Sequence, residues 1–270
     1  MQSDFWSIAV SSGFYGRFDE QFLAECEENG IGAVELSLAL HKLNGELDFE
    51  KNPQKAAQMA QKYGVKITSL HLPFWGKGVE IDLASPDELL RTESVQLQTA
   101  LIRAAGQISI PIVVVHPCLE PVPQEQRDLR MEQAIKSFRD LVQVAEPLGI
   151  RIAAENLPRS CLCRTPQEMN RLLDAVPGLY VCFDTNHSLL QTNAEYIHAV
   201  ADKIITLHVS DYDFIDERHL LPFEGKIDWP ALLGNLRESD YRGLFTFESG
   251  WHETHTLEDL CACYDRLANL

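Results

Sequence analysis

The stretch LYVCFDTNH, at residues 179–187, begins as an apolar strand and ends in polar residues. Its first five residues are large and mostly apolar, as in a strand that is covered on both faces. Asp184 and His187 follow, so a carboxylate and an imidazole come at the carboxyl end of the strand. Because side chains alternate along a strand, Asp184 shares one face with Cys182, whereas Phe183 lies on the other. The stretch therefore predicts a buried strand with functional groups at its tip.

Seven further apolar runs, rich in β-branched residues, alternate with helical segments along the chain. They are WSIAVSSG (6–13), AVELSL (33–38), KITSLHLP (66–73), IVVVHP (112–117), RIAAENLP (151–158), IITLHVSD (204–211) and GLFTFESG (243–250). Alternation of strand and helix indicates parallel pairing. Eight such units without a linker or a low-complexity tract predict an α/β protein, a single (β/α)8 TIM barrel that forms one domain over residues 1–270. A doubly wound open sheet is the alternative, although no strand is followed by a GxGxxG turn.

Helix boundaries are also marked in the sequence. Ser85-Pro86 and Thr165-Pro166 each place a capping residue before a proline, with an acid at the third helical position. Glycines that follow helical patterns predict left-handed caps at Gly30, Gly64 and Gly149.

Composition and charge exclude several classes of protein. The formal net charge is −17, and nucleic-acid binding depends on a basic surface, so nucleic acid is not expected as a partner. No segment approaches the ~20 consecutive apolar residues of a membrane span, and the N-terminus lacks the basic region of a secretory signal. We therefore expect a cytoplasmic protein without a membrane partner, whose seven cysteines are free thiols. Whether the chain forms a homo-oligomer is left open.

Polar residues follow most of the predicted strands. They are His71, His116, Glu155, Asp184, His187, His208, Asp211 and Glu248. Any one of them alone would be read as a hydrogen-bonded structural residue, but the carboxyl ends of all barrel strands meet at one mouth. Several buried carboxylates and imidazoles are costly to bring together unless a cation neutralises them. Mixed carboxylate and imidazole ligands suit Mn²⁺, Zn²⁺, Co²⁺ or Mg²⁺, so we expect one divalent metal ion as the cofactor.

Four segments carry a resemblance to a known family. AAENLP, CFDTNH, TLHVSD followed by EGKIDW, and FTFES occur in this order and resemble the xylose-isomerase-like barrels, over nearly the whole chain. That family includes sugar and sugar-phosphate isomerases and epimerases, inosose dehydratases and apurinic-site endonucleases. In its isomerases and epimerases, strands 5 to 8 each supply one ligand to a single divalent cation. The resemblance therefore implies a metal site made of Glu155, Asp184, His208 and Glu248.

The resemblance also implies a reaction. The cation would chelate a ketose carbonyl and the neighbouring hydroxyl, which makes the adjacent C–H acidic and stabilises the enediolate. Glu155 and Glu248 would flank the substrate as the catalytic acid and base. The expected activity is that of a metal-dependent sugar isomerase or epimerase. The sequence does not decide between a free sugar, a sugar phosphate and a keto-inositol, nor between epimerisation, isomerisation and dehydration.

Six residues are candidates for binding the substrate, partly from the resemblance and partly from their places after strands. They are His71, His116, His187, Arg218, Trp75 and Trp251. Each has a structural alternative. His187 would instead orient Asp184, Arg218 would be a solvated loop charge, and the tryptophans would pack against neighbouring loops.

Two other functions remain open. The apurinic-site endonucleases of this family hold three zinc ions, and the additional ligands they use correspond here to His71, His116, His187 and the pair Glu217 and His219. However, Glu217 stands where those enzymes carry aspartate, and the chain is strongly acidic. A barrel that binds a sugar or a metal without turning it over is the other alternative, although such a protein has no need of two opposed glutamates.

Overall fold

Eight parallel strands form the centre of the molecule. The computed structural model describes residues 5–13, 16–38, 48–76, 79–250 and 254–270. The strands pair in the order β10-β1-β2-β3-β6-β7-β8-β9. Their bounds are β1 Ile8–Ser11, β2 Ala33–Ser37, β3 Lys66–His71, β6 Ile112–Val115, β7 Arg151–Glu155, β8 Leu179–Asp184, β9 Ile204–His208 and β10 Phe245–Phe247. All eight predicted strands are confirmed.

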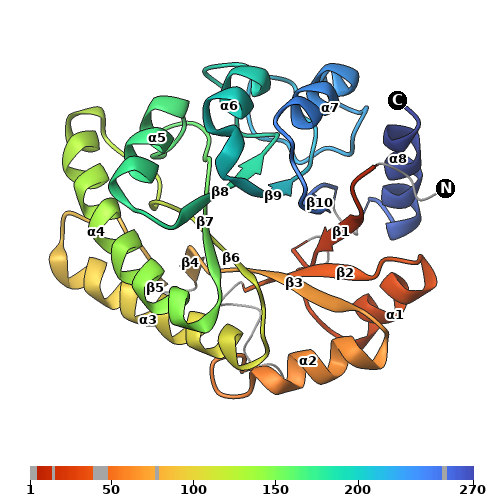
Figure 1. The fold of residues 1–270 in the computed structure, drawn as a ribbon, viewed down its shortest axis with the longest axis horizontal. Helices are drawn as coiled ribbons and strands as arrows, with labels where there is room; N and C mark the ends of the chain where they lie inside the picture. Colours follow the sequence, from red (N-terminus) through yellow and green to blue (C-terminus); the bar gives the residue numbers. More distant parts are fainter. Residues whose placement is uncertain (1–4, 14–15, 39–47, 77–78, 251–253) are drawn as a thin grey trace.

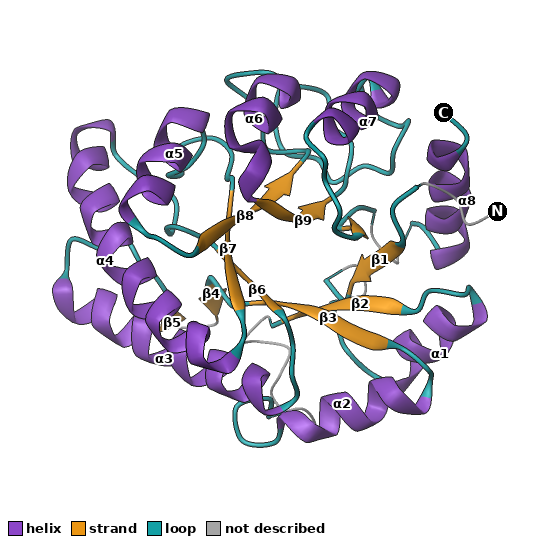
Figure 2. Ribbon diagram, in the orientation of Figure 1, coloured by secondary structure: helices purple, strands orange, loops and turns teal. Residues whose placement is uncertain are grey.

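The two ends of this sheet meet. Val209, just after β9, forms a parallel bridge with Phe247 of β10, and its N–H donates to Thr246 O at 2.8 Å. The sheet is thereby a nearly closed barrel, and the helices surround it as Figures 1 and 2 show. The prediction of a single (β/α)8 TIM barrel is confirmed.

Eight α-helices and three short 3-10 helices connect the strands in the part of the chain that the structure describes. The α-helices are α1 Glu20–Glu28, α2 Pro53–Lys62, α3 Glu88–Gln107, α4 Arg127–Ala145, α5 Pro166–Ala175, α6 Asn193–Val200, α7 Trp229–Glu238 and α8 Leu257–Ala268. The 3-10 helices are η1 Gln124–Gln126, η2 Glu146–Leu148 and η3 Ala201–Lys203. Helix α8 lies against the start of the chain, where the Tyr264 hydroxyl donates to Trp6 O at 2.9 Å.

The predicted helix boundaries are confirmed in all but one case. Thr165 caps α5 by accepting from Glu168 N, and Gly30, Gly64 and Gly149 have φ values of 71°, 67° and 70°. The cap predicted at Ser85 is wrong, because α3 begins at Glu88 and its N-cap is Asp87. The Ser85 hydroxyl instead accepts from Asp87 N, so it shapes the turn that precedes the helix.

Strand alternation separates two apolar layers, as the sequence predicts. Phe183 and Phe247 belong to the large core between the strands and the helices. Val114, Ala153 and Cys182 form a separate small cluster, which fills the middle of the barrel. Side chains that share a face with Cys182 and Ala153 therefore point into the barrel, and this holds up to the strand tips.

A short hairpin follows β3 and was not predicted. Its strands are β4 Trp75–Gly76 and β5 Val79–Glu80, which pair antiparallel. Two residues per strand are too few for alternation to be recognisable in the sequence.

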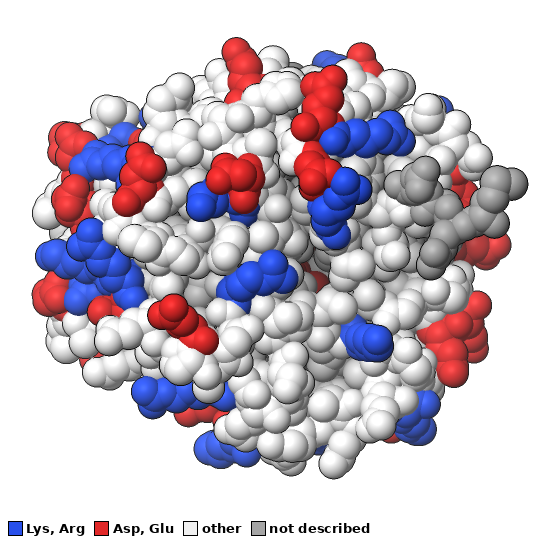
Figure 3. Space-filling view, in the orientation of Figure 1, with Lys and Arg blue, Asp and Glu red and all other residues white. Residues whose placement is uncertain are grey.

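A cavity of about 580 Å³ enters the barrel at the amino-terminal ends of the strands. Residues of β3, β6, β7, β9 and β10 line it, among them Ser69, Arg151, Thr206 and Thr246. Figure 3 shows a hollow near the middle of one face of the molecule, with acidic and basic side chains interspersed around it.

The seven cysteines are free thiols. Among the described residues, no helix has the length and apolar character needed to cross a membrane.

Candidate metal centre at the mouth of the barrel

Four consecutive barrel strands each deliver one potential ligand to the same place. Glu155, Asp184 and His208 are the last residues of β7, β8 and β9, and Glu248 follows β10 directly. One ligand atom from each lies within 4.8 Å of those of the other three. The first three side chains are at most 1% exposed, and that of Glu248 is 22% exposed. The cluster predicted from the sequence is therefore brought together, with one acid at its rim.

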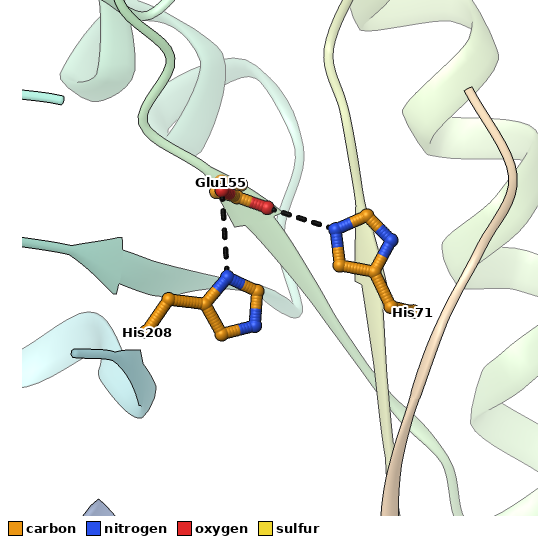
Figure 4. A group of neighbouring side chains, drawn as sticks. All are labelled: His71, Glu155 and His208. Carbon is orange, nitrogen blue, oxygen red and sulfur yellow. Dashed lines mark hydrogen bonds and ion pairs between the residues drawn. The ribbon is translucent and has the colours of Figure 1, made fainter. Parts of the chain in front are cut away.

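Glu155 lies between two histidines, as Figure 4 shows. Its Oε2 is 3.2 Å from His71 Nε2, and its Oε1 is 3.4 Å from His208 Nδ1. His116 Nε2 is also 3.2 Å from Oε2. The His116 ring stacks on Phe74, with 4.0 Å between the ring centroids. The histidines predicted on the third and fourth barrel strands thus both contact Glu155.

Hydrogen bonds from Nδ1 to backbone carbonyls fix the orientation of three imidazole rings. These bonds run from His71 to Leu72 O (3.0 Å), from His187 to Asn156 O (2.8 Å) and from His219 to Glu248 O (3.0 Å). Because a carbonyl only accepts, each Nδ1 carries a hydrogen, and each ring turns its Nε2 toward the carboxylates. A bound cation would take the place of the proton on Nε2. Metal-binding histidines are held in the same way, with one nitrogen fixed by an acceptor and the other free to bind.

Several atoms at this mouth are buried without a hydrogen-bond partner among the described residues. They include Asp184 Oδ2, His187 Nε2 and His208 Nδ1. Buried polar atoms in native proteins are rarely left without a partner, so this group needs an explanation. A divalent cation bound with Glu155 and Glu248 would satisfy Asp184 Oδ2 and His208 Nδ1, and this donor set of carboxylates and an imidazole suits Mn²⁺, Co²⁺ or Zn²⁺. The residues present therefore fit a metal ion.

Burial and mutual charge shift the pKa values of the cluster. Burial raises the pKa of Asp184 to about 6. Burial also acts to raise the pKa of Glu248, but the neighbouring His208 outweighs it and lowers that pKa to about 2. For His71, burial alone would lower the pKa, whereas the hydrogen bond to Glu155 and its charge raise it to about 9. The pKa of His208 is also raised well above its usual value, so without a cation, protons on His71 and His208 offset the charge of the carboxylates.

A second cluster lies beside the first. One ligand atom each from His187, Glu217 and His219 lies within 4.8 Å of the other two. Glu217 Oε1 is 3.0 Å from His219 Nε2, while its Oε2 is 2.5 Å from Nη1 of Arg159. The structure therefore brings the predicted additional metal residues, Glu217 and His219, next to His187. Arg159 occupies one of the two carboxylate oxygens, so a cation at this cluster would share Glu217 with a guanidinium.

Asp211 has a different role from the one its place after a strand suggests. Its carboxylate is fully buried and accepts four hydrogen bonds from the loop that follows and from the first residue of α7. The donors are Tyr212 N (2.8 Å), Ile227 N (3.0 Å), Phe223 N (3.0 Å) and the Trp229 indole (3.0 Å). Gly225 passes so close that a Cβ there would lie 2.3 Å from Asp211 Oδ1. Asp211 is thus no part of the metal cluster; it holds the loop that carries Glu217 and His219.

Of the remaining predicted substrate residues, only the Arg218 side chain is described, and it is not part of the cluster. The Arg218 side chain is 55% exposed, and its Nε lies 3.8 Å from Asp213 Oδ2. Trp75 begins the short strand β4, but its side chain lies outside the described part of the structure, as does Trp251. Their substrate contacts stay predictions.

Two asparagines that the sequence did not single out position Asp184. The Asn156 side chain donates to Asp184 O at 3.0 Å and accepts from Asp184 N at 2.7 Å. The N–H of Asn186 donates to Asp184 Oδ1 at 2.7 Å, which turns Oδ2 toward the histidines. Each asparagine lies within two residues of a predicted ligand, and this proximity in the sequence could have identified both as candidates for positioning it.

Comparison with known proteins places the chain among barrels of one kind. A family model described as xylose isomerase-like TIM barrel matches residues 23–266. An uncharacterized protein of Methanocaldococcus jannaschii is 25% identical over 215 residues, which are 79% of this chain and 80% of that protein.

Solved structures share the fold at lower identity. A D-tagatose 3-epimerase-like protein has a TM-score of 0.81 and 24% identity, over 97% of this chain and 98% of that one. The 3-keto-D-glucoside 4-epimerase of E. coli has a TM-score of 0.77 and 17% identity, over 98% of this chain and 100% of that one. A D-psicose 3-epimerase from Clostridium cellulolyticum, solved with D-tagatose, has a TM-score of 0.78 and 16% identity, over 97% and 98%.

Proposed function

This chain belongs to the xylose isomerase-like TIM-barrel family, and on that premise we propose that it is a divalent-metal-dependent sugar isomerase or epimerase. One observation carries the proposal. Glu155, Asp184, His208 and Glu248, from four consecutive strands, converge within 4.8 Å at the mouth of the barrel. This donor set of carboxylates and an imidazole, without a thiolate, argues against a structural zinc site and suits a catalytic divalent cation.

The two glutamates suit proton transfer to and from a sugar. A bound divalent cation would polarise a ketose carbonyl and its neighbouring hydroxyl, which acidifies the adjacent C–H. The carboxylate of one glutamate takes that proton, and the other glutamate, in its protonated form, returns a proton to the sugar. Return to the opposite face of the same carbon gives an epimer, and return to the neighbouring carbon gives an isomer. Glu155 and Glu248 come from different strands, so they approach a substrate from different sides of the mouth.

The fold neighbours support a sugar as the substrate class. Their names describe a D-tagatose 3-epimerase-like protein, a D-psicose 3-epimerase and a 3-keto-D-glucoside 4-epimerase, and each match covers 97% or more of this chain. We further propose that the partner is a small-molecule sugar rather than nucleic acid. The proposed location is cytoplasmic. The net charge of −17 supports the first of these.

Metal analysis followed by an activity screen tests the proposal. Protein purified without chelator should contain about one ion per chain or bind one on addition of Mn²⁺, Co²⁺ or Zn²⁺. A panel of ketoses, their phosphates and keto-inositols, incubated with the loaded protein in D₂O, should show deuterium incorporation at one carbon. The proposal would be refuted if the protein bound no divalent metal and caused no deuterium exchange in any substrate of the panel.

A second candidate function is a zinc-dependent phosphodiesterase of the apurinic-site endonuclease kind. The cluster of His187, Glu217 and His219, together with His71 and His116 on Glu155, favours it, because it supplies ligands for more than one ion. About three zinc ions per chain and cleavage of DNA at an abasic site would establish this function. Binding of a sugar without exchange or turnover would instead identify a non-catalytic barrel.

A further inference from the structure

We infer that Glu35 is a positioning residue that aims His208 Nδ1 at the metal site. This inference rests on the proposed metal centre, and it assigns a role to a buried acid outside the ligand set. Glu35 lies on β2, across the barrel from the four ligand-bearing strands, and is completely buried.

The two carboxylate oxygens of Glu35 contact side chains from two different strands, β9 and β3. Its Oε1 lies 3.0 Å from His208 Nε2, and its Oε2 accepts from the Ser69 hydroxyl at 2.8 Å. Because a carboxylate only accepts, the hydrogen of the neutral His208 ring stays on Nε2. Without a metal, Nδ1 is turned toward the carboxylates, 2.8 Å from Glu248 Oε2 and 3.4 Å from Glu155 Oε1. Once this nitrogen loses any proton to bind a cation, its lone pair points at the same place.

His208 differs in this respect from the other imidazoles of the mouth. His71, His187 and His219 are each held at Nδ1 by a backbone carbonyl and present Nε2. His208 is held at Nε2 by a side-chain carboxylate and presents Nδ1. A carboxylate behind a metal-binding histidine fixes the ring and raises the basicity of the ligand nitrogen. The orientation of His208 therefore depends on a replaceable side chain, unlike that of the other three.

The backbone is shaped to place Glu35 there. The register between β2 and β3 shifts after Val34, which pairs with Ile67, so that Glu35 pairs with Ser69. Thr68 is the extra residue, and its hydroxyl donates to Val34 O at 3.1 Å. Bulges near active sites re-aim side chains in this manner. The irregularity brings Ser69 beside Glu35 and lets both side chains face the interior of the barrel.

A purely structural role does not account for an acid at this position. Burial of a carboxylate is costly unless it is paired, and among the described residues no Lys or Arg lies within ion-pair distance of Glu35. Its partners are a neutral hydroxyl and an imidazole that the metal site itself uses. A glutamine would fill the same space, but its single oxygen could accept from only one of the two partners, and its NH2 group would have to donate to the other. The carboxylate accepts from both and adds a negative charge behind the histidine.

Metal affinity of three variants tests the inference. Glu35→Leu removes the acceptor, and Glu35→Gln keeps an acceptor but removes the charge. Asp82→Asn is the matched control, because Asp82 is a buried carboxylate paired with Arg130, apart from the metal cluster. Dissociation constants for Mn²⁺ and Co²⁺ are measured by competition with a chelator, and the visible absorption spectrum of bound Co²⁺ reports on ligand geometry.

We expect Glu35→Leu to weaken metal binding by about 10- to 100-fold and to change the Co²⁺ spectrum. Glu35→Gln should lose less affinity, and it remains informative if the leucine variant does not fold. Asp82→Asn should bind metal like the wild type. Wild-type affinity and an unchanged spectrum in both Glu35 variants would overturn the inference while leaving the proposed function intact. Failure of the wild-type protein to bind any divalent ion would overturn both.

Discussion

Asp184 and His208 are paired directly across neighbouring strands, and Asp184 Oδ2 lies 4.0 Å from His208 Nδ1. This distance is too long for a hydrogen bond. Two ligand atoms that are each about 2 Å from a common ion are separated by at most about 4 Å, so the spacing suits a shared cation. The register of β8 and β9 thus sets one edge of the proposed metal site.

Asp184→Ala should abolish metal binding, because it removes the ligand at the centre of this edge. Elemental analysis of the purified variant, reloaded with Mn²⁺, should show far less than one ion per chain. Asp202→Ala, at an exposed acid of η3, is the control and should retain the wild-type content. Full metal content in Asp184→Ala would exclude Asp184 as a ligand.

Glu155→Gln and Glu248→Gln should each lower kcat by about 10²- to 10⁴-fold, because an amide cannot exchange the proton. Substrate affinity should change far less, provided that the metal content of each variant is measured and restored. Glu28→Gln, at an exposed position of α1, serves as the control. Equal losses of substrate binding and turnover would contradict the acid and base roles.

His219→Ala should leave one bound ion per chain if the protein is a single-metal sugar enzyme. His219 lies in the second cluster, and its Nδ1 donates to the backbone carbonyl of Glu248 in the first. Metal content before and after the substitution distinguishes the two candidate functions. A fall from two or three ions would favour the phosphodiesterase.

Metal-free protein should lose stability as the pH rises from 6.5 to 10. In the folded chain the pKa is about 9 for His71 and about 10 for His219, raised above 6.5 by hydrogen bonds to Glu155 and Glu217 that outweigh burial. Below pH 6.5 both rings are protonated in the folded and unfolded chains, so the stabilisation is complete. Above it, the unfolded chain no longer binds these protons, and the advantage is lost as the pH passes the folded values.

Thermal unfolding in the presence of a chelator measures this effect. The midpoint should fall between pH 6.5 and pH 10, and it should fall less with excess metal, because a bound ion requires the unprotonated rings. A midpoint that rises over this range in chelator would show that the histidines do not hold protons in the metal-free fold.

Asp211→Ala should destabilise the protein by at least about 3 kcal/mol, since it leaves four buried donors without their charged acceptor. Asp211→Asn should cost less, because its amide oxygen still accepts. Urea denaturation of both variants, compared with the exposed control Asp240→Asn, measures the difference. A loss below about 1 kcal/mol in Asp211→Ala would mean that the loop is held by other contacts.

The sequence predicted the barrel and the gathering of polar residues at its mouth for the same reason, whereas the ligand roles of these residues come from the family resemblance and stay predictions. Strand alternation gives the inward face, and parallel strands end at one mouth, so Glu155, Asp184 and His208 follow from their places in the strands. Beyond the last paired residue this rule no longer applies, and Asp211 therefore turned out to face its own loop. No function could be assigned to Glu35 from the sequence. A single acid in AVELSL does not reveal the bulge between β2 and β3, nor the contact with His208, which is far away in the sequence.

Three of the imidazoles at the mouth are aimed by backbone carbonyls, and this has an evolutionary consequence. A carbonyl is present whatever side chain its residue carries, so mutations at Leu72 or Asn156 do not remove the acceptor itself. Loops around the mouth are then free to diverge while the imidazoles keep their direction. A barrel built in this way can acquire new substrates by exchanging loops, and grafting a loop from a relative should alter sugar preference without loss of the metal.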